Sequence, residues 1–143
     1  MFTPTRDQAR RFFIDAWRKR KDGLPGTPLE TIAGDLAAMH PEYQRLLEGG
    51  EESLSREWVP EDGQTNPFLH LSLHLAVEEQ LSIDQPPGIR AAFDRLLARR
   101  GDRHDALHAI LECLGETVFQ SARDRAPPDA DAYLECIRRA AGG

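Results

Sequence analysis

Apolar residues recur every three or four positions along most of this chain, which is the period of an amphipathic α-helix. Capping residues mark the start of several periodic segments; Thr27, for example, precedes Pro28 and Glu30 as in a capping box. Glycine and proline mark where the segments end. The first predicted helix begins at Thr3-Pro4 or Thr5 and ends at about Lys21. Further helices are predicted over about 28–40, 67–83, 89–100 and 102–125, and a last one from the 127–129 turn to about 139. Pro41 is expected to open an additional short helix.

The sequence carries no comparable signal for β-strands. No run of strand length alternates apolar and polar residues, and no Asn-Gly or similar hairpin turn is present. We therefore predict an all-α protein of about six helices that form one bundle, with residues 1–143 in a single domain. The least regular segment is 49–66, where Glu61-Asp62-Gly63 is expected to form a surface connection.

The segment 67–83 is apolar on all sides of the predicted helix, which is typical of a helix buried at the centre of a protein. Its most apolar part, 68–77, is too short to span a bilayer, so no membrane association is expected. The N-terminus carries Arg6, Asp7, Arg10 and Arg11 where an export signal would be apolar. These features together predict a cytoplasmic protein.

The charge of the chain is unevenly distributed. The net charge is −6, which argues against general nucleic-acid binding because phosphate contacts need a basic surface. Residues 1–21 are nevertheless basic, with only Asp7 and Asp15 to offset seven cations: Arg6, Arg10, Arg11, Arg18, Lys19, Arg20 and Lys21. Two interpretations follow. The basic helix packs beside an acidic part of the same chain, or it contacts a partner, either an acidic protein or RNA.

The chain contains two cysteines, Cys113 and Cys136, and no C-x-x-C motif. In a cytoplasmic protein we expect both to be free thiols, since reducing compartments disfavour disulfides. Cys113 is expected to be a small core residue, because it points away from the neighbouring Glu112 around the same helix.

Two matching triplets of histidine and glutamate carry the most specific chemistry in the sequence. Each has the form H-x3-H-x3-E, they lie 34 residues apart, and together they use four of the five histidines. Residues four apart share one face of a helix, so each triplet is a stripe of ligands for zinc, iron or manganese. The sequence predicts a metal site between two helices, with the ligands His70, His74, Glu78, His104, His108 and Glu112.

The geometry of a helix limits how the triplets can bind metal. The ends of one triplet are about 12 Å apart, so a single ion cannot contact all three members. Antiparallel helices would form two sites, each with two histidines and one glutamate. Parallel helices would bring the four histidines together, with Glu78 and Glu112 in an adjacent layer. Alternatively, the triplets form a buried polar network without metal. His40, which stands before a proline, is interpreted as a helix-end residue with no ligand role.

The sequence does not determine the reaction, if there is one. An enzyme of this kind would use metal-bound water, with Glu79 or Glu116 as a base. The alternative is a non-catalytic interaction module that contacts its partner through the basic N-terminal helix. No catalytic triad, phosphate-binding glycine loop or dinucleotide fingerprint is present. The sequence does not determine the oligomeric state, and a homo-oligomer is one of the alternatives.

Three segments of the chain resemble a small bacterial family known as domain of unknown function 1841 (DUF1841). They are the opening 6–13 with Trp17, the segment 66–76 followed by 79–80 and 84–89, and the segments 104–108 and 112–116. The resemblance covers nearly the whole chain. It implies a short, cytoplasmic, proteobacterial protein in which the histidine-rich segments are family hallmarks, and it supplies no activity, cofactor or partner.

Overall fold

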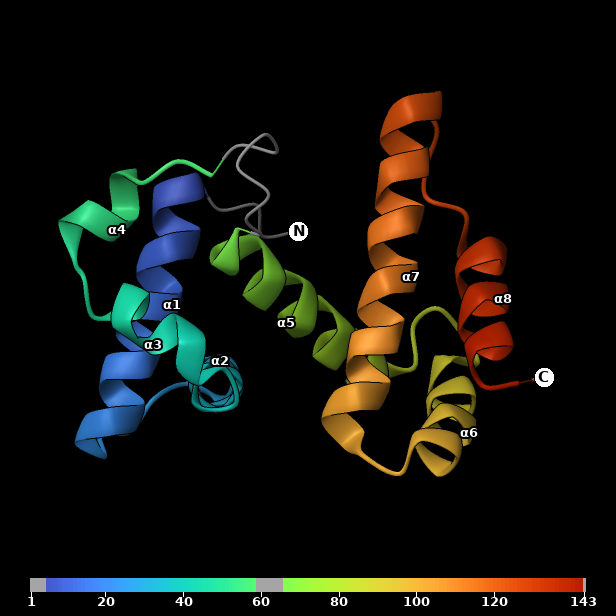
Figure 1. Cartoon of the computed structure of the whole chain (residues 1–143), viewed down its shortest axis with the longest axis horizontal. Coiled ribbons are helices and arrows are strands. Elements are labelled where there is room, and N and C mark those ends of the chain that lie inside the picture. The colour runs from blue at the N-terminus through green and yellow to red at the C-terminus, as the bar shows by residue number, and fades with distance from the viewer. Residues whose placement is uncertain (1–4, 59–65, 143) are drawn as a thin grey trace. The chain divides into compact units, whose positions relative to one another are not determined.

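A computed structural model describes residues 5–58 and 66–142, and this part of the chain is helical throughout, without a β-strand (Figure 1). The all-α prediction is confirmed. The expected number of about six helices is too low. The short helix expected at Pro41 is α3, of 7 residues, and α4, of 5 residues, lies in the segment 49–66 that is expected to be irregular. The helices are α1 (Arg6–Asp22), α2 (Pro28–Ala38), α3 (Pro41–Leu47), α4 (Glu51–Ser55), α5 (Pro67–Ile83), α6 (Ile89–Arg100), α7 (Arg103–Asp124) and α8 (Ala130–Ala140).

The helices begin where the capping residues predicted. Thr5 and Thr27 each form a complete capping box, in which the side-chain oxygen accepts a hydrogen bond from the backbone three residues later. Asp102 and Asp129 cap α7 and α8 in the same way. The alternative start at Thr3-Pro4 and the expected connection at Glu61-Asp62-Gly63 lie outside the described residues.

The chain divides into two compact units, Met1–Leu75 and Ala76–Gly143, and the boundary falls inside α5. The prediction of a single domain stays a prediction. Among the described residues, no helix combines the length and apolar character that crossing a bilayer requires.

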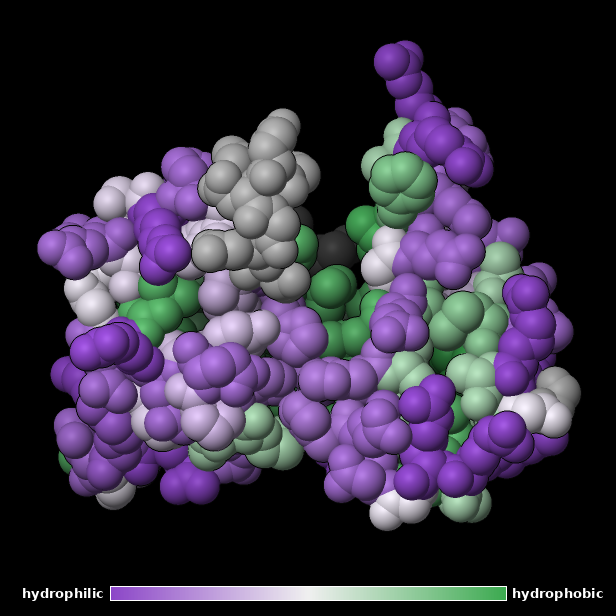
Figure 2. Space-filling model, viewed as in Figure 1, coloured by the Kyte–Doolittle hydropathy of each residue, from purple (hydrophilic) through white to green (hydrophobic). Residues whose placement is uncertain are grey.

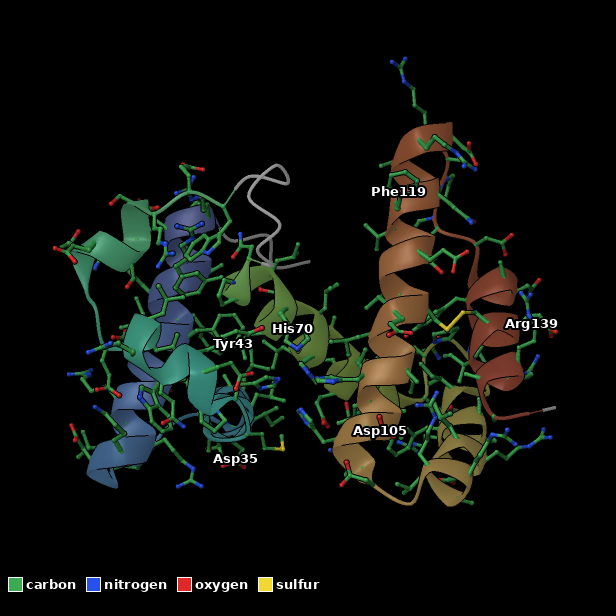
Figure 3. All side chains as sticks on the ribbon, in the orientation of Figure 1. Asp35, Tyr43, His70, Asp105, Phe119 and Arg139 are labelled. Atoms are coloured by element: carbon green, nitrogen blue, oxygen red, sulfur yellow. A yellow bond between two sulfur atoms is a disulfide. The ribbon has the colours of Figure 1, made fainter. Side chains whose placement is uncertain are left out.

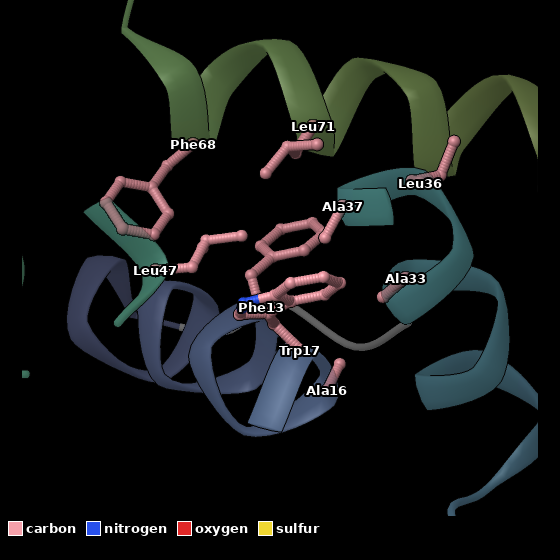
Figure 4. Close-up of a cluster of buried hydrophobic side chains, with 9 residues drawn as sticks. All are labelled: Phe13, Ala16, Trp17, Ala33, Leu36, Ala37, Leu47, Phe68 and Leu71. Atoms are coloured by element: carbon pink, nitrogen blue, oxygen red, sulfur yellow. The ribbon is translucent and has the colours of Figure 1, made fainter. Parts of the chain in front are cut away.

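The first unit is built around the packing of α1 on α2. Gly34 allows the two helices to approach closely, since a Cβ atom at this position would lie 3.0 Å from the Arg20 Cβ and 3.1 Å from the Ala16 carbonyl oxygen. Aromatic and aliphatic side chains from α1, α2, α3 and α5 fill the core (Figure 4), which comprises Phe13, Ala16, Trp17, Ala33, Leu36, Ala37, Leu47, Phe68 and Leu71. This core supports the turn between α2 and α3, where His40 lies.

The second unit packs α6, α7 and α8 against one another, with α8 returning beside α7 (Figure 1). Its fully buried apolar side chains include Ile89, Leu96, Leu107, Ile110 and Ile137. Cys113 of α7 and Cys136 of α8 form a disulfide, with Cα atoms 5.8 Å apart. The prediction of two free thiols is therefore wrong. The turn after α7 brings together two cysteines that are 23 residues apart, and cysteine spacing alone does not reveal such a contact.

Candidate metal centre

Three histidines of the first unit lie against one another. His40 is the N-cap residue of α3, and His70 and His74 belong to the first half of α5. The ring centroids are 5.0 Å apart for His40 and His70, and 4.8 Å apart both for His40 and His74 and for His70 and His74. His74 is fully buried, His40 is 2% exposed and His70 is partly buried. The predicted stripe of α5 therefore meets a histidine from another helix.

A backbone hydrogen bond fixes the orientation of the His40 ring. Its Nδ1 atom lies 2.7 Å from the carbonyl oxygen of Leu36, in the last turn of α2. A carbonyl oxygen can only accept, so Nδ1 must donate, and the lone pair of the neutral ring is on Nε2. Histidines that bind metals commonly donate their second ring nitrogen to a carbonyl or carboxylate in this way. His40 thus presents Nε2 as a ligand atom.

Tyr43 covers one side of this histidine group (Figure 3). Its ring stacks on His40 with 5.3 Å between centroids and 3° between planes, and it meets His70 edge-on at 5.8 Å. Burial raises the pKa of the Tyr43 phenol, with a smaller contribution from the nearby Glu42 carboxylate. The phenol is therefore neutral at physiological pH. It forms part of the wall around the imidazoles.

The second unit contributes a separate pair of histidines. Asp102 starts α7, and His104 and His108 then lie one turn apart on the same face, with 4.2 Å between ring centroids. Both side chains are partly buried. A ring nitrogen of His104 lies within 4.8 Å of a ring nitrogen of His108. In the first unit, His40 and His74 also have ring nitrogens within 4.8 Å of each other. Each unit therefore holds two imidazoles at a spacing that could accommodate a metal ion.

The glutamates of the two triplets are placed differently from the histidines. Glu78 accepts two hydrogen bonds from the Arg103 guanidinium, at 2.8 and 3.1 Å, and is 16% exposed. This pairing raises the pKa of Arg103, whose guanidinium also lies over the ring of Phe93 at 5.7 Å. Glu112 is exposed. The roles of Glu78 and Glu112 as metal ligands stay predictions. Glu79 and Glu116, the predicted bases, are exposed, and their role also stays a prediction.

His40 is the candidate ligand that the sequence interpretation missed. It is a helix-end residue, as expected, but it is buried against His70 and His74. A signal for this was present: His40 follows Leu36 by four residues and so continues the buried face of α2.

The basic residues of α1 are largely neutralised within the first unit, whose visible face is mostly hydrophilic (Figure 2). Arg10 is 3% exposed and donates hydrogen bonds to the carbonyl oxygens of Ser53, Leu54 and Arg56. The other basic residues of α1 form ion pairs of 2.6–3.9 Å with acidic residues. The pairs are Arg6–Glu57, Arg11–Glu51, Arg18–Asp15, Lys19–Glu30, Arg20–Asp35 and Lys21–Glu48. These contacts favour the interpretation in which the basic helix packs beside an acidic part of the chain.

Residues 5–139 match the model of a family described as "Domain of unknown function (DUF1841)". No curated protein and no solved structure matches the chain. The match covers both histidine groups, and its description names no activity or ligand.

Proposed function

The chain belongs to the DUF1841 family, and we propose that it binds transition metal through two pairs of histidines, His40 with His74 in the first unit and His104 with His108 in the second. Each of these histidines offers one ring nitrogen. Neutral imidazole is a ligand that zinc accepts, and iron or manganese are further candidates. Metal ions bound to histidine would give the four residues a common role.

The observation that carries this proposal is the hydrogen bond from His40 to Leu36. It leaves Nε2 as the lone-pair nitrogen of a buried imidazole whose ring centroid lies 4.8 Å from that of His74. Nitrogen ligands of tetrahedral zinc are about 3.3 Å apart, because each bond is about 2.0 Å long. The separation of up to 4.8 Å between ligand atoms of His40 and His74 requires only small side-chain rotations to reach that value.

Two imidazoles do not fill the coordination sphere of a zinc ion, so each pair leaves positions for further ligands. An ion bound at either pair contributes its binding free energy to folding. Glu78 and Glu112, predicted from the sequence as ligands, stay part of the proposal.

Elemental analysis of the untagged, chelator-free protein tests the proposal. We expect one or two equivalents of zinc, iron or manganese per chain, roughly one for each histidine pair that binds an ion. His74→Gln and His108→Gln should each lower the metal content, while His70→Gln, on the same stripe of α5 as His74, should leave it unchanged. Circular dichroism at low temperature verifies that each variant is helical.

Two results would overturn the proposal. A wild-type protein that is isolated without metal and takes up none of the three ions on titration would make the histidines a buried polar network. Loss of metal from His70→Gln, with retention in a His40→Asn variant, would replace His40 by His70 in the ligand set.

A further inference from the structure

A pocket of about 340 Å³ lies between α7 and α8 of the second unit, and the Cys113–Cys136 disulfide forms part of its wall (Figure 3). The polar side chains that line it are Glu116, Thr117, Gln120 and Arg139. Its volume is within the range of small-molecule sites. Exposed disulfides are reduced more readily than inaccessible ones, and this disulfide borders an open pocket.

The two sulfur-bearing residues differ in their access to the pocket. Cys113 is 3% exposed, while Cys136 is only partly buried. Thiol–disulfide exchange requires a thiolate to reach one of the two sulfurs along the S–S axis. Cys136 is therefore the sulfur that an incoming thiolate meets first.

The charged groups of the pocket indicate which thiol would bind. Arg139 is three residues beyond Cys136 on α8, and its side chain is 71% exposed, with a long ion pair of 3.9 Å to Glu135. Glu116 of α7 supplies a carboxylate, which accepts a hydrogen bond from Gln120 at 3.3 Å. A cation and an anion at one pocket complement a ligand that carries both a carboxylate and an ammonium group.

We propose that this pocket is a thiol–disulfide exchange site for a small zwitterionic thiol of the glutathione class. The carboxylate of the thiol pairs with Arg139 and its ammonium group with Glu116. The bound position brings the thiol sulfur to Cys136 on the open side of the disulfide. The proposal is independent of the metal site.

The exchange proceeds in two balanced steps. The thiolate attacks Sγ of Cys136, forming a mixed disulfide as the Cys113–Cys136 bond breaks and the bonding electron pair leaves on Cys113, which takes up a proton. A second thiolate then attacks the sulfur of the bound thiol and displaces the Cys136 thiolate. The net reaction converts two thiols and the protein disulfide into one small-molecule disulfide and two protein thiols. The thiol is thus the reductant.

Reduction kinetics of the native, oxidised wild-type protein test the proposal. The protein is incubated with reduced glutathione or with uncharged 2-mercaptoethanol, quenched with acid, alkylated and analysed by mass spectrometry. Arg139→Gln should slow reduction by glutathione about fivefold, through loss of one exposed charge contact, and leave reduction by 2-mercaptoethanol unchanged. Arg138→Gln removes the same charge from the neighbouring residue, which does not line the pocket, and should have no effect.

The mixed disulfide provides a second measurement. With oxidised glutathione, Cys113→Ser should accumulate one glutathione on Cys136, and Cys136→Ser should accumulate much less on the buried Cys113. Reduction of the wild-type protein only in denaturant would overturn the proposal and leave a structural disulfide. Equal slowing of both thiols by Arg139→Gln would also overturn it, because the guanidinium would then act without recognising the ligand.

Discussion

His40 and Leu36 are joined by a hydrogen bond of 2.7 Å between the Nδ1 atom of the imidazole and the backbone carbonyl oxygen one turn earlier. The bond satisfies a carbonyl at the end of α2, where the helix cannot continue because Pro41 follows. The same bond sets the tautomer of His40. One contact at the end of α2 therefore orients a candidate metal ligand.

The two roles of His40 can be separated by substitution. The side-chain amide nitrogen of asparagine occupies nearly the position of Nδ1, so His40→Asn retains the bond to Leu36 and removes the Nε2 ligand. We expect His40→Asn to lose metal, and metal-depleted His40→Asn to be about as stable as metal-depleted wild type. His40→Ala should be less stable by about a further 1 kcal/mol, the contribution of the hydrogen bond. Metal content and urea unfolding of chelated protein measure the two effects. Undiminished metal in His40→Asn would contradict the assignment of His40.

The Glu78–Arg103 pair provides a second prediction. Its two parallel hydrogen bonds and the 16% exposure of Glu78 make it stronger than an open surface pair, although Arg103 is 52% exposed. We expect Glu78→Gln to lower the unfolding free energy by about 1 kcal/mol and to leave the metal content unchanged. Urea unfolding and elemental analysis measure these quantities.

The exposed pair Arg123–Asp124 serves as the control, since both side chains are more than half exposed. Asp124→Asn should change the unfolding free energy by only a few tenths of a kcal/mol. If Glu78→Gln instead lost the metal altogether, Glu78 would be a direct ligand, since loss of an outer partner weakens metal binding only about 10- to 100-fold.

The local features of the fold were predictable from the sequence. The capping boxes at Thr5 and Thr27 depend on residues three apart, and the structure contains both. The helical spacing of His104 and His108 likewise depends only on the period of the helix, and their rings lie 4.2 Å apart. Interactions within one or two turns of helix are encoded in sequence spacing, which explains why these predictions were correct.

The features that depend on tertiary packing were missed. His40 belongs to the histidine group because α3 packs near α5, and Glu78 is paired because α7 places Arg103 beside it. The Cys113–Cys136 bond depends on the return of α8 along α7. In each case the partners are more than 20 residues apart, and nothing in the intervening sequence specifies their distance. Periodicity identified the helices that carry the site, and the packing determined its members.

Two helical glycines should respond in opposite ways to substitution by alanine. Both substitutions gain up to about 1 kcal/mol in helix propensity. Within the described structure, a Cβ atom at Gly115 meets nothing within 4 Å. A Cβ atom at Gly34 would lie 3.0 Å from the Arg20 Cβ and 3.1 Å from the Ala16 carbonyl oxygen.

We therefore expect Gly115→Ala to raise the unfolding free energy and Gly34→Ala to lower it by about 1 kcal/mol, since α1 and α2 must separate by a few tenths of an ångström. Thermal or urea unfolding of the two variants side by side measures the difference. A stabilised Gly34→Ala protein would show that the packing of α1 on α2 adjusts at little cost.

Acid stability should depend on Asp84, which connects α5 to α6. Its carboxylate accepts backbone hydrogen bonds from Arg90 at 3.0 Å and from Gly88 at 3.3 Å. These bonds, the one from Arg90 first, hold the pKa of Asp84 below its ordinary value of 3.8. The folded state thus binds this proton less readily than the unfolded state. The resulting stabilisation is present above pH 3.8 and is lost as the pH falls through the lowered pKa.

Asp84→Asn isolates this contribution, because asparagine tolerates the positive φ of 52° at this position and does not titrate. The wild-type protein should be more stable than Asp84→Asn near neutral pH, and the difference should shrink as the pH falls below about 4. Urea unfolding of both proteins across this range measures the difference, with chelator present so that metal release does not contribute. A difference that is constant with pH would mean that the amide accepts the two backbone bonds as well as the carboxylate does. The charge of Asp84 would then have no part in stabilising the connection between α5 and α6.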